Sequence, residues 1–432
     1  MLLIKERLNL AIIGCGKRGQ EYLENCLKRN DINIKAIADP DDDMNARSKA
    51  IIEKYNVKNV TFYNQGSNDY LKLFQNESLD AVIICSPWED HISQALSAID
   101  FGIIPGLEVC GANNLEECWK IVHKSEEKNI PVMILENVCF RRDIMAIFNM
   151  VKQGLFGELL LCHGGFQHDL RRLKFNNGKD RYGLSTQSGE HIFGETKWRT
   201  KYNQDRNGDL YPTHGFGPLA NLLDINKGNC LISIASFATK SRGLHKYIVE
   251  SPYGGPNCAN ANVEFKLGDI ITSVFQTSNG ETIVLTFDTN NPRPNNFGFR
   301  VQGTEGLWHD LADGEEENGL IYLEKFASKK NKWDNSESML SQYEHPLWKK
   351  YHKETTEVVG YGGMDFFVLH TFIESIKHNL PFPFDVYDLA TWYAITPLSE
   401  KSIAEGGQVQ PFPDFTNGAW KNRKNNFTFD NF

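Results

Sequence analysis

The first third of the chain alternates apolar runs with amphipathic segments. The apolar runs predict five strands, at residues 8–13, 32–38, 80–85, 103–109 and 130–135. The segments between them repeat apolar residues at helical spacing and predict helices at 17–29, 43–55, 90–101 and 114–128, with a shorter helix at 67–74. Strands that alternate with helices are joined by crossover connections, so this part of the chain is expected to form a parallel sheet.

The rhythm changes near residue 140. An amphipathic helix is expected at 141–153, where it ends at Gly154, and a strand is expected at 158–166. The polar, glycine-rich stretch at 167–208 has few long apolar runs. We expect this stretch to be a functional insertion over a cleft.

Strands dominate much of the remaining chain, after a helix at 215–225. They are predicted at 230–237, 261–267, 270–277, 281–288 and 297–303. The sequence Ser-Asn-Gly-Glu at 278–281 is typical of a hairpin turn. Helices at 363–378 and 386–404, separated by the proline-rich segment 379–384, close the chain.

The composition is that of an ordinary globular protein, with 41% hydrophobic and 23% charged residues. A net charge of -9 with no basic block argues against a nucleic-acid partner. No stretch reaches the roughly twenty apolar residues that cross a bilayer, and the first strand begins at residue 8, which leaves no room for a secretory signal. The sequence therefore predicts a cytoplasmic protein that does not enter a membrane.

Nine cysteines are scattered along the chain without a CxxC spacing. Several of them, such as Cys85 and Cys162, lie in apolar runs. This pattern is typical of buried, reduced thiols and not of a disulfide framework, and no metal site is expected.

Three glycines, Gly14, Gly16 and Gly19, directly follow the first predicted strand. In a dinucleotide-binding turn the first glycine permits a tight turn, the second lets backbone N–H groups approach a pyrophosphate, and the third lets the helix pack on the strand. The pyrophosphate would lie at the positive end of the helix that starts near Lys17 and Arg18.

An acid, Asp39, ends the second apolar run about twenty residues after the glycines. A carboxylate at this place accepts hydrogen bonds from a ribose 2′-hydroxyl and repels a 2′-phosphate, which favours NAD over NADP. The alternative is a glycine loop that binds no nucleotide. The strand, the spacing and the terminal acid all favour NAD.

These signals define a fold of the α/β class. A chain of 432 residues is too long for one typical core, so two domains are expected. We predict an N-terminal Rossmann domain at 1–139 and a C-terminal α/β domain at 140–432 with a largely antiparallel open sheet. The uncovered face of such a sheet often mediates association, and we expect a homo-oligomer of undetermined order.

Two segments after parallel strands carry a family resemblance. Ser86-Pro87-Trp88-Glu89-Asp90-His91 follows the strand 80–85, and Glu108-Val109-Cys110 ends a further strand. This layout resembles the Gfo/Idh/MocA family of sugar and cyclitol oxidoreductases, whose corresponding motifs line the nicotinamide site. The resemblance implies that Ser86, Trp88, His91 and Glu108 lie near the cofactor, although His91 could simply begin its helix.

Other segments extend this resemblance and mark one departure from it. Arg300–Gly306 looks like the turn in the second domain of that family. The lysine that those dehydrogenases use for proton transfer is replaced by Val109. Valine cannot exchange a proton.

A narrower resemblance covers most of the chain. Six motifs in order resemble glycoside hydrolase family 109, which contains NAD-dependent α-N-acetylgalactosaminidases: Leu107–Val109, Leu115–Trp119, Leu135–Asn137, Asn207–Gly215, Asp288–Pro294 and Gly362–Asp365. In the mechanism attributed to that family, NAD takes a hydride from C3 of the sugar, the C2 proton is lost, and the glycosidic oxygen leaves by elimination. Water then adds and the hydride returns.

This resemblance implies a small-molecule sugar or glycoside as substrate, and two other interpretations stay open. One is a net NAD-dependent sugar or cyclitol dehydrogenase, and the other is a non-catalytic NAD-binding protein. Phe166 stands where the resemblance leads us to expect a tyrosine, and Tyr361 stands where we expect a histidine.

His214 is the candidate for acid–base catalysis. An imidazole titrates near working pH, and the Tyr-Pro-Thr turn would present it on a loop before a helix. The alternative is a structural histidine at a helix start. Tyr211 could hydrogen-bond the sugar or share the proton relay, or it could pack beside Pro212.

Glu108 and Glu136 end parallel strands at the carboxyl side, where open α/β sheets bind ligands. We expect both, with the adjacent Asn137, to face the nicotinamide half of the cofactor.

The remaining candidates are substrate-binding side chains: His168, Trp198, Arg199 and Arg293. An indole stacks on the C–H face of a sugar, and a guanidinium binds hydroxyl or acyl oxygens. Trp198 could equally be a core residue.

Overall fold

The computed structural model describes residues 6–189, 192, 194–310 and 319–427, which divide into two compact units. The first unit comprises the described residues within Met1–Arg141, Leu347–Tyr393 and Asn425–Phe432. The second comprises those within Arg142–Pro346 and Ala394–Lys424. Residues 347–393 thus group with the first unit, whereas the division drawn from the sequence assigned them to the second domain.

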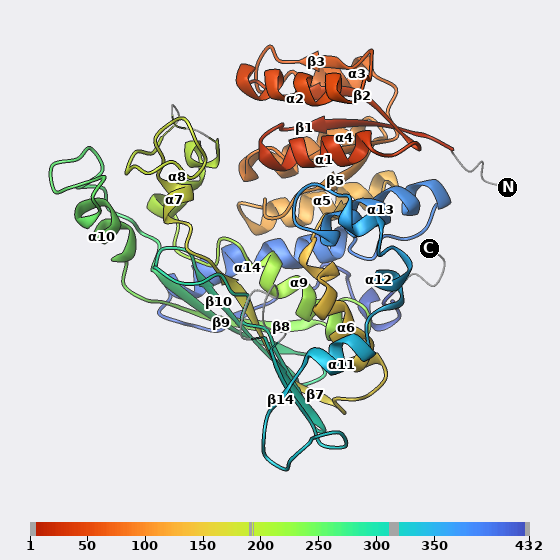
Figure 1. Ribbon diagram of the computed structural model, residues 1–432, viewed down its shortest axis with the longest axis vertical. Helices are drawn as coiled ribbons and strands as arrows, with labels where there is room; N and C mark the ends of the chain where they lie inside the picture. The colour runs from red at the N-terminus through yellow and green to blue at the C-terminus, as the bar shows by residue number, and fades with distance from the viewer. Residues whose placement is uncertain (1–5, 190–191, 193, 311–318, 428–432) are drawn as a thin grey trace. The chain divides into compact units, whose positions relative to one another are not determined.

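A parallel sheet forms the centre of the first unit (Figure 1), and within the described residues its order is β3-β2-β1-β4-β5-β6. Its strands are β1 (Leu8–Ile13), β2 (Ile32–Ala38), β3 (Thr61–Tyr63), β4 (Ala81–Ile84), β5 (Ile104–Leu107) and β6 (Met133–Ile134). The apolar runs 8–13 and 81–84 are almost entirely buried, as expected for strands covered on both faces. The predicted parallel sheet is confirmed.

Helices connect these strands, and two from late in the chain join the unit. They are α1 (Lys17–Leu27), α2 (Asp42–Lys54), α3 (Tyr70–Asn76), α4 (His91–Asp100), α5 (Leu115–Lys128), α13 (Gly363–His378) and, apart from its first residue, α12 (Pro346–Lys350). The long helix α14 (Val386–Ala404) belongs to the second unit from Ala394 onward. The helices expected at 363–378 and 386–404 have the predicted bounds.

A mixed sheet forms the centre of the second unit, in the order β14-β13-β12-β11-β7-β10-β9-β8-β15 over the described residues. Its strands are β7 (Leu159–Gln167), β8 (Leu231–Ala238), β9 (Ile270–Thr277), β10 (Thr282–Asp288), β11 (Arg300–Gly303), β12 (Gly306–His309), β13 (Leu320–Leu323), β14 (Asp334–Asn335) and β15 (Gln410–Pro411). All of these neighbours pair antiparallel except β7 and β10. The largely antiparallel sheet is confirmed, and the homo-oligomer stays a prediction.

The strand predicted at 261–267 is wrong. This segment alternates buried and exposed residues, as a strand does, but it has no strand partner. Phe265 packs instead in a small core with Phe175, Leu244 and Ile248. The alternation therefore reflects an extended segment lying on that core.

The second unit also contains the helices α6 (Arg142–Lys152), α7 (Arg171–Lys174), α8 (Arg199–Asp205), α9 (Thr213–Leu222), α10 (Gly243–Glu250) and α11 (Glu337–Gln342). The segment 167–208 contains α7 and α8. No helix of the described ranges has both the length and the apolarity to cross a membrane.

Helix α9 meets strand β7 through glycines. A Cβ built on Gly215 would lie 2.5 Å from the Cα of Gly165, and one built on Gly164 would lie 2.6 Å from the carbonyl oxygen of Gly215. Only hydrogen fits at these positions without displacement. The helix backbone therefore lies directly on the strand, next to Phe166 and His214.

Replacing Gly215 with alanine tests this contact. Alanine normally stabilises a helix by up to about 1 kcal/mol relative to glycine, but here its Cβ must push α9 from β7, at a cost of about 1–3 kcal/mol. We expect G215A to lose free energy of unfolding, measured by urea titration. A more stable variant would show that the helix is not pressed against the strand.

Candidate functional site

The glycine turn of the first unit is packed where it meets the sheet and open at the start of α1. Gly14 has φ +82°, and a Cβ there would lie 2.4 Å from the backbone nitrogen of Ser86. A Cβ on Gly19 would lie 2.0 Å from the carbonyl oxygen of Gly14. A Cβ on Gly16 would meet no atom within 4 Å. The open space at Gly16 lies before the helix N-terminus, where a pyrophosphate fits.

Asp39 follows the end of β2 and is buried. Its Oδ2 accepts from the backbone nitrogen of Cys15 at 2.6 Å, and its Oδ1 accepts from that of Asp41 at 2.8 Å. These bonds tie the carboxylate to the glycine turn. A carboxylate oxygen has a second lone pair, so Asp39 can still accept from a ribose hydroxyl.

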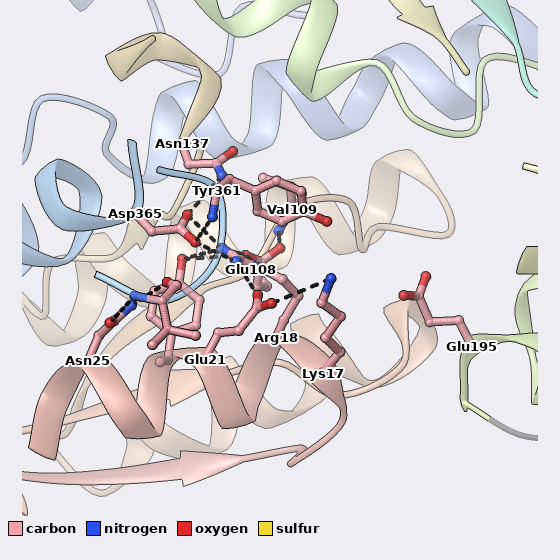
Figure 2. A network of polar contacts seen from close by, with 12 residues as sticks. Lys17, Arg18, Glu21, Asn25, Glu108, Val109, Asn137, Glu195, Tyr361 and Asp365 are labelled. Carbon is pink, nitrogen blue, oxygen red and sulfur yellow. Dashed lines mark hydrogen bonds and ion pairs between the residues drawn. The ribbon is translucent and has the colours of Figure 1, made fainter. Parts of the chain in front are cut away.

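Arg18 is the centre of a polar network beside this turn (Figure 2). Its Nη1 donates to Asp365 Oδ2 at 2.8 Å and to Glu21 Oε2 at 2.7 Å, and its Nε donates to Glu108 Oε1 at 2.9 Å. Burial opposes the charge, but Glu108 and Asp365 outweigh it and hold the pKa of Arg18 well above its ordinary value. Asn137 Nδ2 donates to Asp365 Oδ1 at 2.9 Å, so the five side chains of Arg18, Glu21, Glu108, Asn137 and Asp365 share one network.

Asp365 is a residue that the sequence marked only by its motif, Gly-Gly-Met-Asp. It lies at the start of α13 and accepts from the backbone nitrogen of Tyr361 at 3.0 Å. The Tyr361 ring centroid is 5.5 Å from Lys17 Nζ and 5.2 Å from the Arg18 guanidinium. All three residues are labelled in Figure 2. The motif therefore belongs to the nucleotide-binding unit, where it fixes Arg18.

The residues after β4 form a buried turn. Ser86 Oγ donates to Gln94 Oε1 at 2.7 Å, and His91 Nε2 lies 2.8 Å from the carbonyl oxygen of Ser86. Burial lowers the pKa of His91 to about 4, so the ring is neutral. His91 begins α4, and Trp88 is buried beside it in the chain. His91 thus supports this turn without carrying a charge.

Glu136 lies two residues beyond β6 and is fully buried. Its Oε1 accepts from the backbone nitrogen of Val138 at 2.9 Å. The carboxyl ends of β5 and β6 thus place Glu108 and Glu136 at the same edge of the sheet, as the sequence predicted.

The second unit brings Tyr211, His214 and His168 together around Phe166. Tyr211 Oη lies 3.4 Å from His214 Nε2. The Phe166 ring stacks on Tyr211 at 4.4 Å and on His168 at 4.2 Å between centroids, and Phe297 lies 5.1 Å from His168. We call these five residues the aromatic cluster. His214 lies in the first turn of α9, not on a loop before the helix as the sequence suggested.

Two arginines place positive charge beside the aromatic cluster. The Arg199 guanidinium lies 5.2 Å from the Tyr211 ring centroid, and Arg293 Nη1 donates to Gln167 Oε1 at 2.9 Å. Burial, and then the charges of His214, Arg293 and Arg199, lower the pKa of His168 to about 3. His168 is therefore a neutral imidazole. Trp198 adjoins Arg199, with 5.8 Å between guanidinium and ring.

Three carboxylates near the aromatic cluster are each bound to an arginine. The N–O distances are 3.1 Å for Asp288 and Arg293, 3.1 Å for Glu195 and Arg199, and 2.6 Å for Asp169 and Arg171. An arginine stays charged at any working pH and binds the ionised form of its partner. These three acids are therefore held as members of ion pairs.

Lys174 is a residue of this region that sequence reasoning missed. It is 2% exposed, and its Nζ donates to Thr289 Oγ1 at 2.7 Å and to Asn290 Oδ1. Its carbonyl accepts from Thr200 Oγ1 at 2.6 Å. Burial, followed by the charge of Arg199, lowers the pKa of Lys174 well below its ordinary value. The side chain ties the insertion to the loop after β10, and because lysine is rarely buried, no sequence pattern signals it.

Comparisons with known proteins assign a family to each part of the chain. Residues 8–135 match the model described as oxidoreductase family, NAD-binding Rossmann fold, and residues 140–422 match glycosyl hydrolase 109, C-terminal domain. NAD is therefore the cofactor of the first unit. Among the described residues, no group of three or more His, Cys, Asp or Glu side chains is arranged to hold a metal ion.

Relatives match along nearly the whole chain. It is 44% identical over 427 residues to a glycosyl hydrolase family 109 protein of Parabacteroides distasonis, covering 98% of this chain and 89% of the relative. It is 44% identical over 421 residues to an α-N-acetylgalactosaminidase of Tannerella forsythia, covering 96% and 88%. The crystal structure of an NAD-binding oxidoreductase from Klebsiella pneumoniae shares the fold, with a TM-score of 0.68 at 15% identity over 94% of this chain and 99% of that one.

Alanine at position 16 separates nucleotide binding from folding. Its Cβ meets no protein atom, so we expect the stability of G16A without nucleotide to match the parent, while the methyl group enters the pyrophosphate space and weakens NAD binding. G19A is the matched contrast, since its Cβ meets the carbonyl of Gly14 and must cost stability. Calorimetric titration with NAD and urea unfolding measure the two effects. Unweakened NAD binding in G16A would place the nucleotide elsewhere.

Proposed function

This chain belongs to glycoside hydrolase family 109, and we propose that it is an NAD-dependent glycosidase that acts by transient oxidation at C3, elimination, water addition and re-reduction. NAD, when bound, supplies the acceptor and the returning donor for a hydride. The overall reaction is then a hydrolysis with no net redox change. A glycoside is the substrate class that this proposal implies.

The proposal rests on the contact between His214 and Tyr211, the side chains of the second unit that are best suited to transfer a proton. Ordinary glycosidases use two carboxyl groups, one as acid and one as base or nucleophile. Asp288, Glu195 and Asp169 are instead each bound to an arginine. A histidine and a tyrosine in contact suit the proton transfers that oxidation and elimination require.

In this proposal His214 accepts and returns a proton at the substrate, and Tyr211 shares that proton across the 3.4 Å contact. His168, as a neutral imidazole, can accept from a sugar hydroxyl or donate to one. Arg199 and Arg293 bind sugar oxygens through N–H groups of their guanidinium. Trp198 supplies an apolar face for the C–H side of the ring.

The side chains of the first unit hold the nucleotide in this proposal. The start of α1, with Lys17 and Arg18 beside it, takes the pyrophosphate, and Asp39 takes the ribose. The nicotinamide half is assigned to the side chains beyond the carboxyl ends of the strands: Ser86, Trp88, His91, Glu108, Glu136 and Asn137. The network around Arg18 includes two of these, Glu108 and Asn137.

A net sugar or cyclitol dehydrogenase is the second candidate, and Val109 argues against it. Val109 is buried, and its backbone nitrogen donates to Glu108 Oε2 at 2.9 Å. Valine has no proton to exchange at this position. The name of the Tannerella relative suggests an N-acetylgalactosaminide as the first substrate to try. Phe166 and Tyr361, which depart from the expected tyrosine and histidine, make a wider panel necessary.

A substrate panel distinguishes the two candidates. The purified protein, without added nucleotide, is incubated with p-nitrophenyl glycosides in deuterated water. We expect nitrophenol release, deuterium at C2 of the product and no net reduced nucleotide, because the C2 proton is lost to solvent and the redox change is reversed. Turnover that consumes free NAD in proportion to product would establish the dehydrogenase instead.

Replacing His214 tests its role as acid and base. We expect H214A to keep NAD bound while kcat falls at least about a hundredfold, the usual cost of losing such a group. His245, an exposed histidine of α10, gives the matched control, and H245A should keep the activity of the parent. Near-normal turnover of H214A would assign proton transfer to another residue.

A further inference from the structure

Asp209 is a buried carboxyl for which the roles above leave no function. It lies in the loop between α8 and α9, two residues before Tyr211, and is 2% exposed. Burial raises the pKa of this carboxyl from its ordinary 3.8 to about 7, against the opposite effect of the backbone N–H of Tyr211. An ionised acid in this place costs folding free energy, so a purely structural role would be better filled by an amide.

The backbone at Asp209 is held by α14. Asp209 N donates to Ser399 Oγ at 2.9 Å, and its carbonyl oxygen accepts from Thr396 Oγ1 at 2.7 Å. A Cβ on Gly208 would lie 2.5 Å from Glu400 Cγ, so the loop fits tightly on this helix. These contacts fix the point from which the carboxyl projects.

The carboxyl in turn holds Tyr211. Asp209 Oδ1 accepts from the backbone nitrogen of Tyr211 at 3.1 Å, which closes a two-residue Asx turn. This turn sets the direction in which the tyrosine side chain leaves the loop. Its ring stacks on Phe166 at 4.4 Å, and its hydroxyl lies 3.4 Å from His214 Nε2. The position of the Asp209 carboxyl therefore determines how Tyr211 contacts His214.

The charged groups on the elements around Asp209 are engaged with one another. Arg206 of the same loop binds Glu400 of α14, with N–O distances of 2.7 and 2.9 Å. His214 of α9 faces Tyr211. Within the described part of the chain, Asp209 itself belongs to no ion pair. A change in its protonation therefore acts on the turn.

We propose that Asp209 is a positioning residue whose ionised carboxyl holds Tyr211 against His214 for proton transfer, an inference that rests on the proposed function. A carboxylate is a stronger acceptor than the neutral acid, so the turn is firm when Asp209 is ionised and loosens when it takes up a proton. Ionisation of Asp209 therefore increases activity and at the same time lowers the stability of the fold.

The two pH effects have opposite signs, which a merely structural residue would not produce. Because the folded protein binds this proton more tightly than the unfolded chain, the contribution of Asp209 to the free energy of unfolding is complete below pH 3.8 and is lost as pH rises through about 7. The contribution of Asp209 to kcat instead increases as pH rises toward and through about 7, because the carboxyl becomes ionised there.

Two substitutions test the proposal. D209A removes the acceptor, and we expect kcat to fall about tenfold to a hundredfold, with a smaller change in KM, because the tyrosine is misplaced. D209N keeps an acceptor oxygen in a side chain that does not titrate. We expect it to restore kcat and to lack the fall in kcat that the parent shows below neutral pH.

Asp385 offers a matched control. Its Oδ1 accepts from the backbone nitrogen of Tyr387 at 3.0 Å in the same kind of turn. D385A should lower stability and leave the pH profile of kcat as in the parent. The proposal would be overturned if kcat of D209N fell below neutral pH as it does in the parent, or if D209A had a normal kcat.

Crystal structures of D209A and D209N give a readout independent of activity. We expect Tyr211 Oη and His214 Nε2 to separate beyond hydrogen-bond reach in D209A and to stay in contact in D209N. An unchanged contact in D209A would overturn the positioning role. A parent that cleaves no glycoside, together with a displaced tyrosine in D209A, would refute the proposed function while supporting the positioning role. If D209A does not fold, the pH profile of D209N still decides.

Discussion

The close contact between β7 and α9 is the constraint on which the second unit's site depends. Gly165 and Gly215 leave room only for hydrogen between strand and helix. Phe166 follows one of these glycines and His214 precedes the other, so the contact brings their rings to 5.6 Å between centroids. Tyr211, three residues before His214 in the loop that precedes α9, joins the same stack. A side chain at Gly215 would separate the groups that this account assigns to proton transfer, because its Cβ would meet the backbone of Gly165.

Arginine–carboxylate pairs determine which side chains near the proposed site are held in ion pairs. Arginines bind the carboxylates beside the aromatic cluster, and the same cations help to keep His168 neutral. Lys174 adds a buried amine that holds the loop carrying Asp288 and Arg293. In the first unit a single arginine, Arg18, binds both Glu108 and Asp365 beside the glycine turn. In each unit, several of the acids near the proposed site are thus fixed by ion pairs with arginine.

The sequence predicted the parts of the fold that local pattern determines. Buried apolar runs such as 8–13 predicted the parallel strands, and the patterns at 363–378 and 386–404 predicted helices with the observed bounds. The sequence did not predict features that depend on contacts between residues far apart in the chain. The alternation at 261–267 comes from packing on Phe175 and Leu244, not from strand pairing. Arg18 meets Asp365 across 347 positions, and Lys174 meets Thr289 across 115. No local pattern encodes such contacts.

The central claim is that cleavage passes through oxidation at C3, and a substrate without the C3 hydroxyl tests it most directly. The best glycoside of the panel is compared with its 3-deoxy and 4-deoxy analogues, with binding and release of the aglycone measured for each. The account predicts that the 3-deoxy analogue binds but is not cleaved, because it has no hydroxyl to oxidise, while the 4-deoxy analogue is still cleaved. Cleavage of the 3-deoxy analogue at a rate comparable to the parent glycoside would contradict the account.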